Sequence, residues 1–343
     1  MSRSLHVPGI DVARTALAVA AASVMWTASD HVTFSVGLAV CLAAPVVEPR
    51  LVGAGSGRPP MRSLAFSVLA IVAAVAFGIA PQSAACAIAA LLIVGAAFPF
   101  HLGYEAVRPH AGVRAFTLLL MSQPGLALAV QILDPQTVTL DVATRSSLTS
   151  WFVLTALVQT GLALVRTEAV RAVFAIAMSQ SALLVGGALA SDHGFASEYL
   201  MLAGSDLGLL ALAILSGDLL RRHGPMQLRP DNGLATIEPR ASQLFLVAGW
   251  LFAGLPGGIV FFAEDVIFHL LVERSPWNAA GMVFASVLNA VAFYRVYLGV
   301  FSGRMRPAAF SPSAMPRLVE FTVVALILAT VVFGCLPQWM TPH

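Results

Sequence analysis

Lysine is absent from this sequence, and charged residues of every kind are scarce. All nineteen basic residues are arginine, and Asp, Glu, Lys and Arg together make up 10 % of the chain, against about a quarter in an ordinary soluble domain. Hydrophobic residues account for 58 %, and the mean hydropathy is +0.86. This balance excludes a soluble globular protein and indicates an integral membrane protein.

Cysteine is also rare, and cofactor motifs are missing. Cys41, Cys86 and Cys335 are scattered along the chain, so neither a disulfide framework nor a CxxC metal or redox site is indicated. The sequence contains no GxGxxG dinucleotide motif and no converging set of metal ligands. We therefore predict no cofactor, no metal site and no nucleic-acid partner, and at most a non-catalytic role beside a redox enzyme.

Apolar runs separated by short polar gaps recur along the whole chain. Most of them are long enough to cross a hydrocarbon core of ~30 Å as a helix, and they lack the alternation of a membrane β-barrel. We predict an all-α, polytopic membrane protein with about 11 transmembrane helices, one of them discontinuous. The predicted spans are 15–28, 32–47, 63–80, 84–100, 115–133, 148–165, 172–190, 199–220, 244–272, 278–300 and 317–336.

The arginines are distributed unevenly between the two sides that these spans define. Arg145 and Arg274 fall on one side, Arg295 falls inside a span, and the remaining arginines fall on the other side. Basic residues concentrate in cytoplasmic loops. We therefore predict a multi-pass protein of the cell (inner) membrane, with its N-terminus in the cytoplasm and its C-terminus outside.

The span at 244–272 is too long for one continuous helix and contains residues that break helices. Unbroken, it would run about 44 Å, well beyond the ~30 Å core. The GLPGG stretch is the expected break, because Pro256 removes a backbone donor while Gly254 and Gly257 admit irregular dihedral angles. In transporters, such breaks lie beside an ion or substrate path.

Two adjacent acids, Glu264 and Asp265, follow this break by about two helical turns. A carboxylate at membrane depth costs roughly 2.5 to 3.5 kcal/mol on insertion scales, and burial favours the protonated form. We interpret the two acids as proton-exchanging groups, with His269 on the same helical face as Asp265. The alternative is a solvated pair near the outer headgroups, close to Arg274.

Several motifs occur together in a recognisable order. FPFHLGYE at 98–105 and RTEAVRAVFAIAMSQ at 166–180 precede GLPGG and FFAED, and AFYRVYLGVFSG follows at 292–303. In this order they resemble the antiporter-like membrane subunits of respiratory complex I and of multisubunit sodium/proton antiporters. The resemblance covers about residues 80 to 305.

The resemblance implies a division of the chain into three regions. These are N-terminal transmembrane helices at 1–80, an antiporter-like transmembrane core at 81–305 and a C-terminal transmembrane helix at 306–343. Members of this family usually have more spans before the core. The chain therefore looks like an N-terminally shortened version of them.

The groups that the family is thought to use for proton transfer are largely replaced. Val94 and Leu209 stand where the resemblance places two buried lysines, and Gln180 stands where it places a histidine. Arginine does not substitute for lysine in a relay, because it does not release its proton. Glu264 aligns with the ionisable residue of the family's broken helix and is the carrier that the resemblance retains.

Other polar residues extend the candidate path. Asp206 lies between glycines in an apolar span, which is compatible with transport or with hydrogen bonding between helices. His101 and Glu105 are four residues apart, as a site of proton uptake or a surface pair would be. The loop at 221–240 either docks a soluble cytoplasmic subunit or follows the basic bias of inner loops.

We predict an antiporter-like subunit that translocates protons, or another monovalent cation, within a larger complex I-like or antiporter complex. Its partners would be other membrane subunits and membrane lipid. One alternative is a non-conducting structural anchor, which the loss of the lysines favours. Another is the membrane half of a cation-coupled inorganic-carbon uptake complex, which the sequence does not separate from the first reading.

Overall fold

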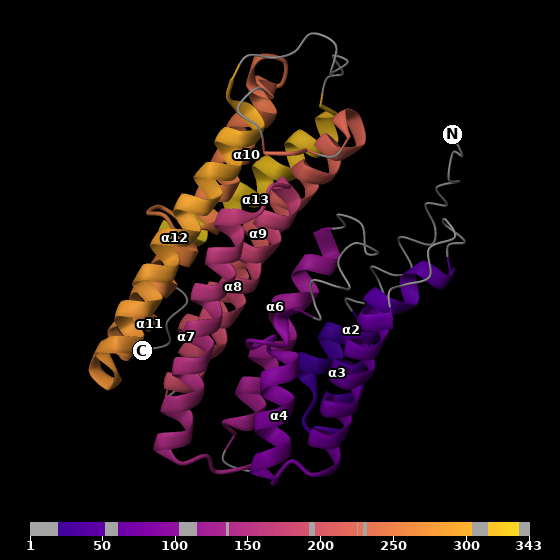
Figure 1. Ribbon diagram of the computed structural model, residues 1–343, viewed down its shortest axis with the longest axis vertical. Coiled ribbons are helices and arrows are strands. Elements are labelled where there is room, and N and C mark those ends of the chain that lie inside the picture. The colour runs from indigo at the N-terminus through magenta and orange to yellow at the C-terminus, as the bar shows by residue number, and fades with distance from the viewer. Residues whose placement is uncertain are drawn as a thin grey trace. The chain divides into compact units, whose positions relative to one another are not determined.

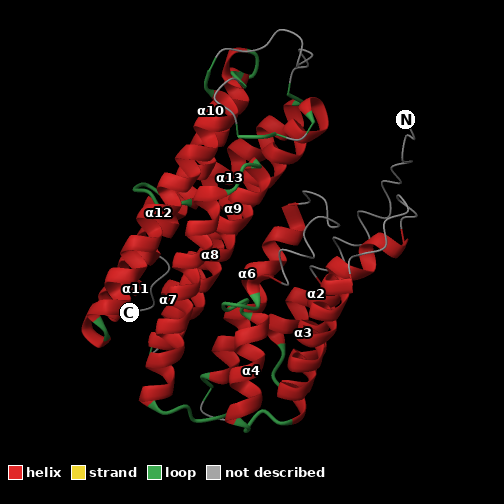
Figure 2. Ribbon diagram, in the orientation of Figure 1, coloured by secondary structure: helices red, strands yellow, loops and turns green. Residues whose placement is uncertain are grey.

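The protein is built from helices joined by loops in the part of the chain that the computed structural model describes, namely residues 20–51, 61–102, 115–134, 137–191, 196–224, 226–228, 232–303 and 315–335. Every regular element in these ranges is a helix (Figure 2), which confirms the all-α prediction. A backbone in hydrocarbon satisfies its polar groups only inside a helix or a closed barrel. The elements are α2 (His31–Leu51), α3 (Met61–Ile79), α4 (Ala84–Val94), α6 (Ala115–Ile132), α7 (Val142–Val165), α8 (Ala169–Ala190), α9 (Ala196–His223), η1 (Leu234–Thr236), α10 (Pro239–Phe252), α11 (Ile259–Arg274), α12 (Pro276–Phe301) and α13 (Arg317–Cys335).

The chain divides into two compact units, the first of which comprises residues 1–112 and 123–142. In this unit α3 packs against both α2 and α4. The rings of Phe34 and Phe77 meet edge to face with their centroids 6.4 Å apart, and both are fully buried. Aromatic contacts of this geometry join α2 to α3.

The first unit also contains a helix that is interrupted near its end. α4 stops at Val94, the backbone of Ala96 has a left-handed φ of 55°, and helix resumes only at His101. A positive φ is uncommon for residues other than glycine. The predicted span 84–100 therefore ends in an irregular turn, and His101 directly follows that turn.

The second unit comprises residues 113–122 and 143–343 and is built around α8. Every residue of α8 from Met178 to Ala190 is buried, as expected of a helix that is apolar on all sides. α8 packs against α9, α11 and α12, and α9 packs in turn against α10, α11 and α13 (Figure 1). α11 itself packs against α8, α9, α10, α12 and α13.

The predicted break in the span 244–272 is present. α10 ends at Phe252 and α11 begins at Ile259, and between them Gly254 and Gly257 have φ values of 75° and 104°. Left-handed dihedral angles strain residues that carry a Cβ, so the two glycines allow this turn. We call residues 253–258 the interruption.

Neighbouring helices approach the interruption through glycines. At Gly334 of α13, a Cβ atom would lie 2.6 Å from the carbonyl carbon of Gly258. At Gly204 of α9, a Cβ atom would collide with the side chain of Ile259. Contacts this close leave no space for a side chain, so α9 and α13 hold the start of α11 in place.

Five helices in the described part of the chain are long and apolar enough to cross a membrane: α7, α8, α9, α12 and α13. Shorter apolar helices lie at 31–42, 65–79 and 84–94. α10 and α11 each fall short because the interruption divides one predicted span into two halves. From residue 31 onward the helices overlap the predicted spans, and their ends differ by a few residues; α7, for example, begins at Val142 rather than at position 148. The first predicted span, 15–28, lies partly outside the described residues, and the number of eleven spans stays a prediction.

Candidate functional site

Glu264 is buried in the second turn of α11, with 8 % of its surface exposed. Because Cα–Cβ bonds in a helix point toward its N-terminus, a long side chain at this position reaches back toward the interruption. The carboxyl group lies against Gly254, where a Cβ atom would be 2.5 Å from Glu264 Oε2. The acid and the interruption are therefore in direct contact.

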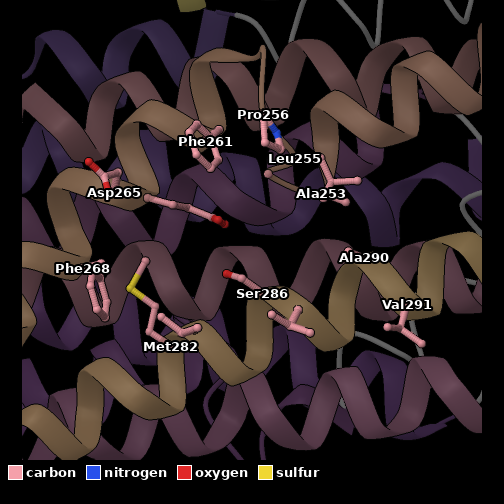
Figure 3. A pocket seen from close by; sticks show the side chains of 14 residues that line it. Ala253, Leu255, Pro256, Phe261, Asp265, Phe268, Met282, Ser286, Ala290 and Val291 are labelled. Atoms are coloured by element: carbon pink, nitrogen blue, oxygen red, sulfur yellow. The ribbon is translucent and has the colours of Figure 1, made fainter.

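A cavity of about 410 Å³ opens between the interruption, α11 and α12. Figure 3 shows Phe261 and Asp265 on one wall, with Met282 and Ser286 opposite. Its walls are apolar apart from the carboxyl groups of Glu264 and Asp265 and the hydroxyl group of Ser286. A carboxylic acid at the edge of such a cavity can exchange a proton with water that enters it.

Two neutral polar side chains lie beside the Glu264 carboxyl group, Gln180 of α8 and Ser286 of α12. Glu264 Oε1 makes no hydrogen bond of good geometry, and the same holds for both amide atoms of Gln180. Gln180 is 1 % exposed. Buried polar atoms are nearly always paired with protein or water, so this group of side chains retains unused hydrogen-bonding capacity.

A hydrogen-bonded cluster continues from Gln180 toward α7. Thr160 Oγ1 lies 3.0 Å from Ser179 Oγ and 2.9 Å from Asn289 Oδ1, and Asn289 Nδ2 donates to Ser179 Oγ at 2.9 Å. All three side chains are fully buried. Next to Thr160, the buried amide group of Gln159 has no hydrogen-bond partner. A row of neutral polar groups thus runs from Glu264 across α12 and α8 to α7.

Asp265 and His269 lie on the exposed side of α11. Their side chains are 57 % and 71 % exposed, and Asp265 Oδ1 lies 3.7 Å from His269 Nδ1. The same ring nitrogen lies 2.8 Å from the backbone oxygen of Asp265. Asp265 therefore lines the outer part of the cavity, whereas Glu264 lies at its buried side.

Asp206 is half-buried on α9 and does not line the cavity. Its neighbours Gly204 and Gly208 face Ile259 and Phe252, on the two sides of the interruption. Asp206 lies about 200° around the helix from each of these glycines. Asp206 is therefore not among the residues that line the cavity with Glu264.

His101 belongs to the first unit and is buried there, with 2 % of its surface exposed. Its ring stacks on that of Phe98, with a centroid separation of 5.6 Å. Glu105, its predicted partner, lies outside the described residues. His101 is therefore an internal residue of the first unit, and its pairing with Glu105 stays a prediction.

Charged residues of the basic loop at 221–240 pair with each other and with a residue of the preceding helix. Arg222 forms an ion pair with Asp218 at 2.7 Å and a second one with Glu238. His223 Nε2 lies 3.4 Å from the same Glu238 carboxyl group. The guanidinium group of Arg222 is therefore internal and is not presented to a soluble partner.

Nothing in the sequence alone distinguishes Thr160, Ser286 and Asn289 as site residues. Each is a single neutral polar residue in an apolar span, and such residues often serve only to bond neighbouring helices. The available signal was the recurrence of adjacent polar residues, as in Ser179 and Gln180, within long apolar runs. That signal does not indicate which helices meet.

The family model for the NADH:quinone oxidoreductase/Mrp antiporter transmembrane region matches residues 66–289. This is well over half of the chain. The matched region contains the α4 turn, the interruption, Glu264 and the neutral polar row. No curated protein sequence matches the chain significantly.

Solved structures share this fold at low sequence identity. The chain aligns over 94 % of its length with chains of the Mrp complex from Dietzia sp. DQ12-45-1b (TM-score 0.75, 17 % identity), an archaeal membrane-bound sulfane sulfur reductase (0.81, 18 %) and respiratory complex I from Thermus thermophilus (0.67, 19 %). It covers 74 %, 59 % and 77 % of those chains. The common fold is therefore established, and the matched chains are longer.

Proposed function

The chain belongs to the NADH:quinone oxidoreductase/Mrp antiporter transmembrane family, and from this premise we propose that it translocates protons, with Glu264 as the proton-carrying group. The observation that carries the proposal is the placement of Glu264. Its carboxyl group lies between the interruption, a cavity and a buried row of polar side chains. A carboxylic acid between a water-accessible space and a polar interior suits proton transfer.

The neutral row supplies the inner part of the path. Gln159 and Gln180 have unused donors and acceptors. They precede or follow in sequence Thr160 and Ser179, which form a hydrogen-bonded cluster with Asn289. Such groups bind water in protein interiors. In this proposal, water held by the row carries the proton to and from Glu264, without the lysines that the family resemblance calls for.

A second candidate function is that of a non-conducting anchor in a larger complex. Val94 and Leu209, at positions where the resemblance places lysines, are buried apolar residues. Neither of them titrates, so a path that needs those lysines is blocked. The anchor and the carrier share one fold and differ in the role of Glu264.

Partners and placement complete the proposal. The similar chains come from multisubunit membrane complexes, which supports an assembly with other membrane subunits, and any redox reaction would belong to those subunits. The arginine distribution supports the inner membrane, a cytoplasmic N-terminus and an outer C-terminus. A soluble subunit would dock at the charged groups of the loop at 221–240 other than Arg222.

The decisive experiment is Glu264→Gln in the intact complex, in inverted membrane vesicles. We expect gradient-coupled proton flux to fall at least about ten-fold, because the amide cannot carry a proton through the buried site. Glu320→Gln is the matched control. That carboxylate lies near the start of α13 and pairs with Arg240 at 3.3 Å, so flux should persist.

One outcome decides between the two candidate functions, and a second identifies the transported ion. An unchanged proton flux in Glu264→Gln would overturn the proposal that Glu264 carries the proton, and would favour the non-conducting anchor. A flux that persists when sodium is replaced by choline would identify the proton as the ion.

A further inference from the structure

The exposed face of α11 carries polar groups where an isolated membrane helix would carry none. The side chains of Asp265 and His269 are more than half exposed. Their exposed neighbours Phe261 and Val272 on the same helix are apolar. The polar pair therefore forms a small island in an otherwise lipid-compatible surface.

With the end of α11 at the membrane boundary, Asp265 lies deeper than the headgroup layer. α11 ends at Arg274, and about 13 Å of helix separates Asp265 from that end. The half-thickness of the hydrocarbon core is ~15 Å. A carboxylate that faced lipid at this depth would cost roughly 2.5 to 3.5 kcal/mol, so this face is expected to be covered by something polar.

The cavity beside Asp265 is acidic and would accommodate a positively charged group. It contains two acids, Glu264 and Asp265, and none of its lining residues is basic. Its volume of about 410 Å³ lies in the range of sites that hold small ligands, about 300 to 1,000 Å³. A long cationic side chain fits both the space and the charge.

An exposed apolar stripe runs along α12 from the cavity, whose lining includes Val287 and Val291. Val287, Val291 and Tyr294 are each at least half exposed. They recur at intervals of three and four residues, so they form one stripe on the helix. A second helix can pack along such a stripe while one of its side chains enters the cavity.

We propose that this face of α11 and α12 is the docking surface for a helix of a neighbouring membrane subunit, which inserts a lysine or arginine into the cavity to pair with Asp265. The partner thus supplies a cation that the cavity lacks. This surface does not depend on whether Glu264 conducts, because the proposal rests on Asp265, the cavity and the α12 stripe.

A photo-crosslinking residue at Val287, in the full chain within its native membranes, tests the proposal. We expect one membrane-protein adduct, and its crosslinked segment should contain a lysine or arginine within an apolar helix. Asp265→Arg should lower the adduct yield at least about ten-fold, because truncated or reversed buried charge pairs cost several kcal/mol. Changing the identified basic residue to aspartate should restore the yield in the Asp265→Arg background.

The control is Glu273→Arg, an equal charge change at an exposed position near the end of the same helix. The adduct yield should stay unchanged there. The proposal is overturned by adducts to lipid alone, by a partner segment without a basic residue, or by equal losses in Asp265→Arg and Glu273→Arg. Proton flux in Glu264→Gln is measured separately, so the two proposals fail independently.

Discussion

Gly254 lies in the interruption and Glu264 lies on α11, and the two residues are so close that a methyl group on Gly254 would not fit between them. Gly254 has a left-handed backbone with φ of 75°, which by itself favours glycine. Two separate constraints therefore act at this residue. Gly257 is subject to the backbone constraint alone. Its φ is 104°, but a Cβ atom there would meet no atom within 4 Å.

Comparison of Gly254→Ala with Gly257→Ala separates these two constraints. We expect Gly257→Ala to cost about 1 kcal/mol of stability from backbone strain alone. Gly254→Ala should cost about 2 to 4 kcal/mol and lower proton flux, because the added methyl group displaces the Glu264 carboxyl group. Unfolding in detergent and vesicle flux measure the two effects. Equal behaviour of the two variants would show that the carboxyl contact is unimportant.

At the scale of elements, the interruption is fixed by the helices around it. Gly334 of α13 meets the backbone at Gly258 and Ile259. Backbone atoms cannot rotate away as a flexible side chain can, so an added methyl group there must shift a helix. Few residues of α13 are buried, and the helix also packs against α9 and α10.

Gly334→Ala should therefore loosen α13 from the interruption. We expect a loss of about 1 to 3 kcal/mol, typical of overpacking, measured by thermal or detergent unfolding. Gly161→Ala on α7 is the matched control, because no atom lies within 4 Å of its added Cβ. There, alanine should be neutral or stabilising by up to about 1 kcal/mol, since it favours helix more than glycine does.

The start of α2 carries a pH-dependent cap outside the membrane-spanning segments. The Thr33 amide donates to Asp30 Oδ1 at 2.8 Å, and this hydrogen bond holds the pKa of Asp30 below its ordinary value. A lowered pKa means that the cap stabilises the fold above the unfolded-state pKa of about 4. That stabilisation is lost as the pH falls through the folded-state pKa.

Asp30→Asn keeps a capping side chain but removes the titration. The wild-type protein should unfold at a higher temperature than the variant at pH 7, because the carboxylate also favours the helix N-terminus. This advantage should disappear below about pH 4. A constant difference across this pH range would show that the cap does not titrate.

At the scale of the whole molecule, an interrupted helix occurs in each of the two compact units among the described residues, namely α4 with its turn before His101 and α10 with α11. The break in 244–272 was predictable because Gly and Pro act on the local backbone. The burial of Glu264 followed from its apolar flanks. Local sequence carries both kinds of information.

The neutral polar row was not predictable in the same way. Asn289 and Ser179 bond to each other although 110 positions separate them in the chain. Nothing in either span indicates that the two helices meet. The side of α9 on which Asp206 lies was equally unpredictable from the sequence, because it depends on which face of α9 packs against the interruption.

Orientation in the membrane can be tested with the native cysteines. Cys335 is exposed at the end of α13, whereas Cys41 is buried and Cys86 is half-buried. With Cys41 and Cys86 replaced by serine, we expect an impermeant maleimide to label Cys335 in intact cells. A cysteine introduced as Thr236→Cys, near the inner loop, should be labelled only after the cells are permeabilised. The reverse pattern would invert the topology.

The tight glycine contacts also limit which amino-acid substitutions this chain can accept during evolution. Gly249 of α10 faces Phe293 of α12, and Gly204 faces Ile259, each without space for a methyl group. A larger residue on one side becomes acceptable only when the opposite residue shrinks. Surviving descendants of this sequence should therefore exchange volume in pairs across these contacts, so that mutations at positions 249 and 293 arise together or not at all.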